Sequence, residues 1–235
     1  MNAETAGNGV LWYLVFLLSV TCHEAAHAYA AHLLGDSTAY RGGQASLNPL
    51  PHIRREPFGT VIVPIVAYLS GGWMFGWASA PYDPVWSDEH PRRMGAMSLA
   101  GPLANLFLFF LAFGILRGGL AAGVLRQPES VSFIRTAVAV NESGLAGPAA
   151  MFLSVLFSLN ILLCCFNLLP VPPLDGRGIV AILLPAKTAR EVMRFLRHPI
   201  LALACLFAAW KYFGLLFRPV FLLCIGFLYP GSHYQ

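Results

Sequence analysis

Apolar stretches long enough to cross a lipid bilayer recur along most of this 235-residue chain. A spanning helix needs about 20 mainly apolar residues. Such stretches cover residues 9–34, 94–116, 148–169 and 199–229. Only 11% of the residues are charged, against about 25% in ordinary soluble domains. These features predict an all-α polytopic membrane protein with about four to six transmembrane helices and no large soluble module.

The stretch from Phe58 to Ala78 is apolar but lacks the pattern of a regular helix. Pro64 and the pair Gly71-Gly72 interrupt it, and it is rich in β-branched residues. We therefore expect a broken or re-entrant segment here, with room for β structure.

Two further predictions concern the ends of the chain. The first apolar stretch is preceded by Glu4 and by no Lys or Arg, so it is predicted to be a retained span and not a cleaved signal peptide. The last stretch, residues 199–229, contains Pro219. This proline is expected to kink or divide it, so that it crosses the membrane once or twice.

The distribution of Lys and Arg favours re-entry over a full crossing at residues 58–78. With the N-terminus outside, re-entry places ten basic loop residues in the cytoplasm and three outside. The ten are Arg41, Arg54, Arg55, Arg92, Arg93, Arg177, Lys187, Arg190, Arg194 and Arg197. A full crossing gives six inside and seven outside, against the excess of positive charge that cytoplasmic loops carry.

Residues 21–36 read TCHEAAHAYAAHLLGD and place two histidines and a glutamate inside the first apolar stretch. On a helix, His23 and His27 project from one face a single turn apart, a spacing that suits two ligands of one Zn²⁺. Glu24 lies close enough to contact a metal-bound water without ligating the metal. Ionisable groups in a membrane segment cost about 2.5 kcal/mol or more each, so the three indicate a common purpose. His32 is expected to make only a structural contact.

A catalytic zinc site of this kind needs a third protein ligand and an open position for water. Asp175, in the sequence FNLLPVPPLDGRG, is predicted to be that ligand. The re-entrant topology brings the ends of the first and third spans to the same side, prolines end the helix before Asp175, and Gly176 adds backbone freedom after it. Alone, this LDG sequence is more typical of a turn; together with HEAAH it favours a ligand.

These motifs, with AGPLAN (100–105) between them, resemble the site-2 protease family of intramembrane zinc metalloproteases. The match is to the compact class that has no PDZ or CBS domain. LNPLPH, FGT and FGWA extend the resemblance over about residues 15–185. It implies one membrane-embedded protease domain over residues 1–235, with a catalytic core at about 9–185 and one or two apolar helices at 199–229.

The resemblance also implies roles for individual residues. His23, His27 and Asp175 match the ligands of one zinc ion per chain, and Glu24 matches the catalytic glutamate, which would act as the general base.

Two asparagines match positions of the same family. Asn105 matches an asparagine that holds substrate or the oxyanion, and Asn167 opens the NLLPVPPLDG motif. Either is predicted to donate a hydrogen bond to the developing oxyanion. The sequence SAPYDP, after FGWA, departs from the lysine-containing strand of the family.

The implied substrate is a single-span membrane protein, such as an anti-sigma factor or a remnant signal peptide, cut within or near its transmembrane segment. The implied location is the cytoplasmic membrane of a bacterium or archaeon, with the active site toward the cytoplasm. No basic stripe suggests nucleic-acid binding, and the five cysteines lie in apolar runs without a C-x-x-C pair.

Two alternatives stay open from the sequence. A zinc or other metal transporter would also carry histidines and acids in its spans, but it has no need of Glu24 between two ligands. A binding protein that retains the fold without catalysis is the second, because fold alone does not establish activity.

Overall fold

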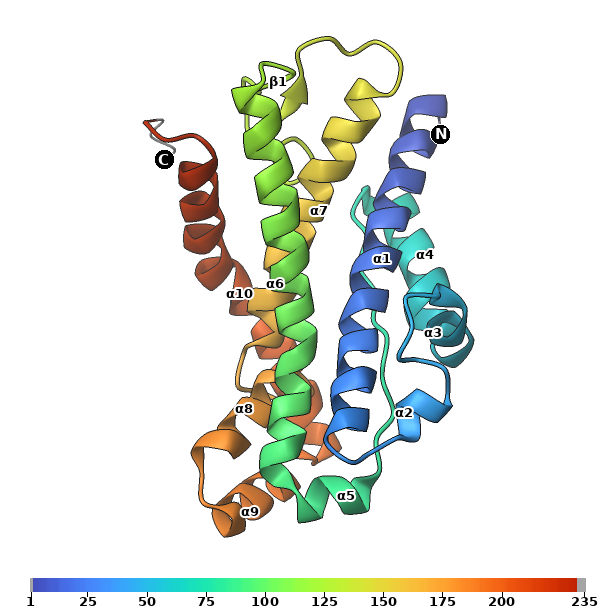
Figure 1. Cartoon of the computed structure of the whole chain (residues 1–235), viewed down its shortest axis with the longest axis vertical. Helices are drawn as coiled ribbons and strands as arrows, with labels where there is room; N and C mark the ends of the chain where they lie inside the picture. The colour runs from blue at the N-terminus through green and yellow to red at the C-terminus, as the bar shows by residue number, and fades with distance from the viewer. Residues whose placement is uncertain (1, 232–235) are drawn as a thin grey trace.

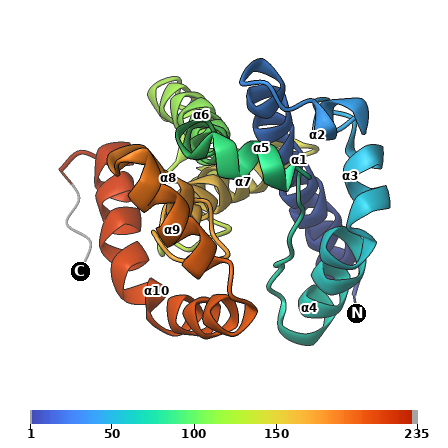
Figure 2. The ribbon, with the colours of Figure 1, turned by 90° about the horizontal axis from the view of Figure 1, so that it is seen from below.

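The computed structural model describes residues 2–231 and is built mainly of helices. Within this range four helices are long and apolar enough to cross a membrane: α1 (Ala3–Leu33), α6 (Pro91–Ala121), α7 (Ala146–Asn167) and α10 (Pro199–Leu228). Helices α1, α6 and α7 run roughly along the long axis of the molecule (Figure 1), whereas α10 is bent and tilted across it (Figure 2). The chain is therefore a multi-pass integral membrane protein, and the all-α prediction is confirmed.

A segment of shorter elements connects α1 to α6. The chain leaves α1 at Gly35, whose φ of 108° suits a residue without Cβ. It then forms α2 (Thr38–Arg41), α3 (Pro49–Arg55), the π-helix η1 (Phe58–Ile62) and α4 (Val63–Gly71). An extended stretch over residues 73–83 leads to α5 (Pro84–Glu89).

Two hydrogen bonds show that this connecting segment turns back. The Tyr68 hydroxyl, in α4, donates to the backbone oxygen of Thr5 at 2.8 Å, near the start of α1. The backbone N–H of Asp83 donates to the Asp36 carboxylate at 2.8 Å, just beyond the other end of α1. The segment rises along α1 and returns to the side where it began, as the charge distribution predicted (Figure 1).

The same segment differs from the prediction in its secondary structure. Residues 58–71 are helical, and the described residues of the segment contain no strand. Two glycines explain how the helical and extended parts cross closely: a Cβ on Gly59 would collide with the Trp77 backbone oxygen, and a Cβ on Gly76 with the Gly59 backbone oxygen. The FGT and FGWA motifs therefore form one packing contact between η1 and the extended stretch.

The centre of the molecule lies between α1, α6 and α7. Phe16, Ala112 and Phe157 are among its fully buried side chains, one from each helix. At the end where the chain begins, β1 (Leu125–Arg126) pairs with β2 (Val138–Ala139) in an antiparallel hairpin. These strands lie in the linker between α6 and α7.

The remaining elements follow α7. They are α8 (Gly176–Leu183), α9 (Ala186–Leu196) and α10. Arg197, at the junction of α9 and α10, binds the Asp88 carboxylate at 2.8 Å and the Ser87 hydroxyl at 2.9 Å, so α5, α8 and α9 gather at one end of the molecule (Figure 2).

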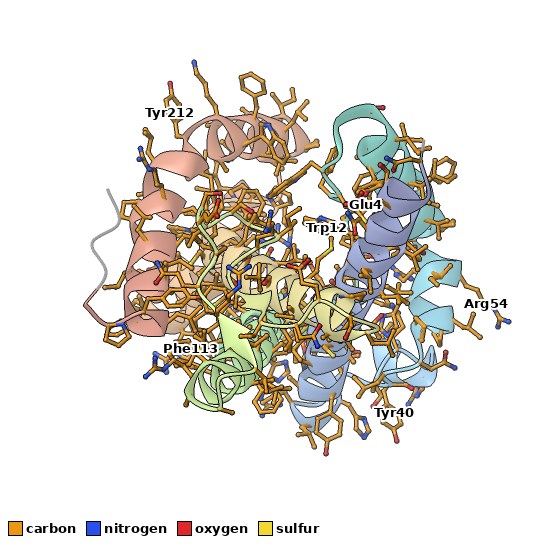
Figure 3. All side chains as sticks on the ribbon, turned by 90° about the horizontal axis from the view of Figure 1, so that it is seen from above. Glu4, Trp12, Tyr40, Arg54, Phe113 and Tyr212 are labelled. Atoms are coloured by element: carbon orange, nitrogen blue, oxygen red, sulfur yellow. The ribbon has the colours of Figure 1, made fainter. Side chains whose placement is uncertain are left out.

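The last apolar stretch forms one continuous helix. α10 has 30 residues with Pro219 inside it, so this stretch is not divided into two spans. Tyr212 of α10 points away from the bundle, whereas Trp12 of α1 lies toward its centre (Figure 3).

Candidate metal centre

The two histidines of the HEAAH turn lie on the buried face of α1. His23 is 7% exposed and His27 is 5% exposed, and both come from a helix without interruption between Ala3 and Leu33. Helix geometry places residues four apart on the same face. The two Nε2 atoms lie 3.0 Å apart, as the sequence spacing predicted.

The third member of the group arrives from the loop between α7 and α8. The Oδ2 atom of Asp175 lies 3.0 Å from His23 Nε2 and 3.2 Å from His27 Nε2. Within the described residues, these three side chains form the one group of this kind able to hold a metal ion. Asp175 and His27 are 148 residues apart in the sequence, so only tertiary packing can bring them together. Helix α6 packs against both α1, which carries His27, and α8, which begins just after Asp175.

Glycines allow that packing. A Cβ on Gly176 would collide with the backbone oxygens of Leu168 and Leu169, and a Cβ on Gly178 would collide with Ser98 of α6. The absence of side chains therefore lets the chain turn tightly after Asp175 and lets α8 lie directly against α6. The LDGRG sequence has a steric role at both glycines.

The protonation of the two imidazoles fits a metal ion. His23 Nδ1 lies 2.6 Å from Asn105 Oδ1, and His27 Nδ1 lies 2.8 Å from the backbone oxygen of Met97. Both oxygens are acceptors, so each Nδ1 carries a hydrogen, and in the neutral imidazole that ligates a metal each Nε2 presents a lone pair. Two bare nitrogens and a carboxylate oxygen would repel one another at 3.0–3.2 Å. A cation among them converts that repulsion into ligation.

The spacing and the surrounding space also fit zinc. The two Nε2 atoms and Asp175 Oδ2 are close enough together to bind one ion. Zinc binds nitrogen and oxygen ligands at about 2.0–2.2 Å. Gly101 of α6 keeps the place clear, because a Cβ there would lie 2.6 Å from His23 Nε2 and even closer to His27 Nε2. The donor set of two histidines and one carboxylate is the kind found in catalytic zinc sites, which leave a fourth position open.

The Asp175 carboxyl group is held in its ionised form. Burial raises its pKa, but positive charge at the neighbouring histidines, carried by protons on Nε2 when no metal ion is bound, outweighs burial, so the pKa lies well below its usual range. An ionised carboxylate is the form that ligates metals.

Glu24 lines a pocket next to this group. The pocket has a volume of about 180 Å³, and His27, Asp175 and Arg177 also line it. Its other walls come from α6 and from Ala78, Ser79, Ala80 and Tyr82 of the extended stretch. Glu24 is 6% exposed, so it is a buried carboxylate in a small pocket beside the metal ligands.

The two predicted substrate asparagines have other contacts. Asn105 is fully buried, and its amide binds His23 and Asn160. Asn167, in the last turn of α7, donates to the backbone oxygen of Leu163 at 3.0 Å. Neither is among the described residues that line the Glu24 pocket. The predicted role in oxyanion binding stays a prediction, and the contacts of Asn105 indicate support of His23.

His32 behaves as expected for a structural residue. Its Nδ1 lies 2.8 Å from the Ser37 hydroxyl, and its ring stacks on Tyr40 with centroids 4.0 Å apart.

Two residues of the site were not identified from the sequence. They are Gly101, whose lack of a side chain is needed at the metal position, and Asn160, the partner of Asn105. An amide in a spanning segment was the available signal for Asn160.

Comparison with known proteins agrees with this geometry. Residues 11–208 match the model of peptidase family M50. The chain belongs to this family, that of the site-2 proteases. Together with the His-His-Asp group, membership makes the chain a membrane-embedded, zinc-dependent metalloprotease.

Two curated relatives are similar over most of the chain. The "Putative zinc metalloprotease YwhC" of Bacillus subtilis (strain 168) is 38% identical over 176 residues, which are 74% of this chain and 69% of the relative. The "Putative zinc metalloprotease Rip2" of Mycolicibacterium smegmatis is 32% identical over 177 residues, 75% of this chain and 58% of the relative. No solved structure gives a significant match.

Proposed function

We propose that His23, His27 and Asp175 hold the catalytic zinc and that Glu24 is the general base for hydrolysis of a peptide bond. The observation that carries this proposal is the convergence of the three ligand atoms within 3.0–3.2 Å of one another. The hydrogen bonds at Nδ1 leave both Nε2 atoms free to bind the metal.

The chemistry divides between the metal and the protein. Zinc in this site supplies a Lewis acid, which makes water nucleophilic near neutral pH and polarises a carbonyl group. Glu24 accepts the proton of the attacking water on a carboxylate oxygen and returns it to the amine that leaves. Glu24 lines the same pocket as His27 and Asp175, so the proposed base lies beside two of the metal ligands.

The extended stretch offers a way to hold an unwound substrate. On one edge, the Trp77 N–H donates to Gly59 and the Ser79 carbonyl accepts from Gln44. Backbone groups alternate between the two edges of an extended chain, so those of Ala78 and Ala80 face the opposite way. In the described part of the chain their N–H groups have no partner, and both residues line the Glu24 pocket.

This open edge suits a transmembrane substrate. A helix in a membrane satisfies its own backbone hydrogen bonds, so unwinding it for cleavage leaves polar groups that need new partners. Pairing with Ala78 and Ala80 would supply such partners beside Glu24, by addition of a strand.

The proline substitution Ala78→Pro tests the edge, with Ala78→Ser as its matched control. We expect Ala78→Pro to reduce cleavage of a helical membrane substrate at least about tenfold, and cleavage of an already unfolded peptide much less. Equal losses for both substrates would contradict strand addition.

The membrane-embedded substrate follows from the family; its closer identity is a proposal. We propose a single-span protein such as an anti-sigma factor or a remnant signal peptide, cut in the cytoplasmic membrane of a bacterium or archaeon. The excess of Lys and Arg at the end of the bundle that holds α5, α8 and α9 supports a cytoplasmic orientation of that end.

The transporter alternative gains no support. In the described chain the metal-ligating side chains form one compact group instead of a series along a path, and the family is one of peptidases.

Metal content of the purified protein tests the site. Wild type is expected to hold one zinc per chain, Asp175→Ala and the His23/His27 double variant to lose most of it, and His32→Ala to keep it. Glu24→Gln should keep the zinc and lose cleavage by roughly a thousandfold or more, because the base is gone while the ligands remain. Zinc that is indifferent to Asp175, or cleavage by Glu24→Gln, would refute the assignments.

A further inference from the structure

Four buried polar side chains form a continuous chain of hydrogen bonds that ends at a metal ligand. Asn160 of α7 donates to the Ser19 hydroxyl at 2.9 Å and accepts from Asn105 Nδ2, also at 2.9 Å. Asn105 in turn accepts the Nδ1 hydrogen of His23 at 2.6 Å. Ser19, Asn105 and Asn160 are all 0% exposed. This hydrogen-bond network therefore runs through the interior from Ser19 of α1 to α7 and α6, and returns to α1 at His23.

Backbone carbonyls determine which side chain donates and which accepts in each hydrogen bond of this network. Asn160 Nδ2 donates to the backbone oxygen of Leu156 at 2.8 Å, and the Ser19 hydroxyl donates to that of Val15 at 2.7 Å. A carbonyl can only accept. The Asn160 amide nitrogen must therefore face Leu156 and Ser19, which leaves its oxygen for Asn105.

The alternative orientation of the amides is unfavourable. Rotating the Asn160 amide by 180° would place its oxygen against the Leu156 carbonyl and its nitrogen against Asn105 Nδ2. Two acceptors and two donors would then face each other in a buried site, where each unmade hydrogen bond costs about 1–3 kcal/mol. The orientation of Asn160 thus favours the orientation of Asn105 in which the Asn105 oxygen faces His23.

The two histidines are set by different means. His27 donates directly to the Met97 backbone carbonyl, which cannot change its role. His23 donates to a side-chain amide, and an amide could present either its oxygen or its nitrogen. Two contacts of Asn105 Nδ2 remove that ambiguity: it donates to Asn160 Oδ1 at 2.9 Å and, over a longer 3.4 Å, to the backbone oxygen of Ser19. The contact with Asn160 is the shorter of the two.

We propose that Asn160 is a positioning residue for the metal centre: acting through Asn105, it holds the tautomer of His23 in which Nε2 is bare. This inference rests on the zinc site proposed above. It assigns to α7, which supplies none of the three ligands, control over one of them.

A general need for polar contacts between helices does not explain this arrangement. Ser158 lies two residues from Asn160 on the same helix, is also 0% exposed, and its hydroxyl has no partner within the described structure. This part of α7 therefore tolerates a buried polar group without a hydrogen bond. The polar side chains that do form hydrogen bonds here, Asn160 and Asn105, are those that lead to His23.

The test is zinc affinity, measured by competition with a chelator on the full-length protein in detergent. Asn160→Leu keeps the side-chain size but removes the acceptor for Asn105, and it should weaken zinc binding about tenfold, within the 10- to 100-fold range for residues behind metal ligands. Asn160→Asp in its protonated form keeps both a donor for the Leu156 carbonyl and an acceptor for Asn105, and it should retain affinity within about threefold. Ser158→Ala is the matched control on the same helix and should have no effect.

A double variant separates positioning from packing. Because Asn160 acts through Asn105, Asn105→Leu with Asn160→Leu should bind zinc no more weakly than Asn105→Leu alone. Independent packing contributions would multiply instead. The visible spectrum of the cobalt-loaded protein gives a second readout, which should change in Asn160→Leu and not in Ser158→Ala.

The possible outcomes are distinct. Losses that multiply in the double variant, or an Asn160→Leu protein with wild-type affinity, would overturn the positioning role while the zinc site stands. If Asn160→Leu fails to fold, Ser19→Ala takes its place with an expected loss of about threefold, and unchanged affinity in that variant overturns the role. Zinc binding that survives Asp175→Ala would instead show that the underlying site is wrong.

Discussion

Helices α7 and α10 are alike in sequence character but differ in their surroundings. Both are long and apolar enough to span a membrane, yet 56% of the most apolar stretch of α7 is buried inside the protein, against 0% for α10. Helix α7 carries Ser154, Ser158 and Asn160 in its buried face. In α10 many large side chains are exposed, as Tyr212 is (Figure 3), whereas Ile225 and Leu228 near the end of the helix are buried.

This difference shows what apolar character can and cannot reveal in a membrane. Lipid tails are as apolar as leucine, so helices gain little from burying apolar side chains against each other. Small and polar residues, which allow close approach and hydrogen bonding, mark the surfaces that pack. The metal centre lies among helices of the packed kind, and α10 supplies none of its ligands.

The sharpest test replaces one glycine in each environment. Gly101→Ala should lower zinc affinity more than a hundredfold and abolish cleavage, because the new Cβ would occupy the space beside both Nε2 atoms. Gly214→Ala in α10, where a Cβ meets nothing within 4 Å, should leave both unchanged. Metal analysis and a cleavage assay measure this, and equal behaviour of the two variants would refute the contrast.

A leucine in each helix gives a smaller effect on stability. Leu159 of α7 is 4% exposed and Leu215 of α10 is 75% exposed. Leu159→Ala should destabilise the fold by roughly 1–3 kcal/mol, less than in a soluble core because only the lost packing counts, and Leu215→Ala by less than about 0.5 kcal/mol. Thermal unfolding in detergent compares them, and a loss at Leu215 as large as at Leu159 would mean that α10 packs more tightly than described.

The smallest effect concerns the contact that returns the re-entrant segment to α1. Asp36 is buried, which raises its pKa, but hydrogen bonds from Thr38 and from the Asp83 N–H outweigh burial and lower the pKa below its ordinary value. Stability from this group is therefore present above the unfolded pKa of about 3.9 and is lost as the pH falls through the folded value.

Asp36→Asn removes this pH-dependent contribution. We expect a loss of about 1–2 kcal/mol at pH 7, measured by thermal unfolding, with the difference from wild type shrinking below about pH 4. Asp83→Asn is a suitable control, since Asp83 contributes its backbone N–H to the contact. A difference that stays constant down to pH 3 would exclude the proposed ionised contact.

Much of the fold was predictable from local features. The four spans, the re-entrant segment and the shared face of His23 and His27 all follow from the apolar stretches, the basic loop residues and the period of the helix. For residues 58–78 the sequence predicted a broken, re-entrant segment correctly, but not its helical secondary structure. The π-helix and the extended stretch depend on the crossing at Gly59 and Gly76, which no local rule describes.

By itself, the sequence determined that this protein lies in a membrane and carries two histidines one helical turn apart with a glutamate beside them. Helix geometry is local, so four residues of spacing were enough to fix that relation. The sequence also predicted Asp175 as the third ligand. Only the tertiary structure places its carboxylate against those histidines and decides which amides orient them. Asp175, Asn105 and Asn160 reach the site from three other segments, brought together by close packing at Gly101 and Gly178.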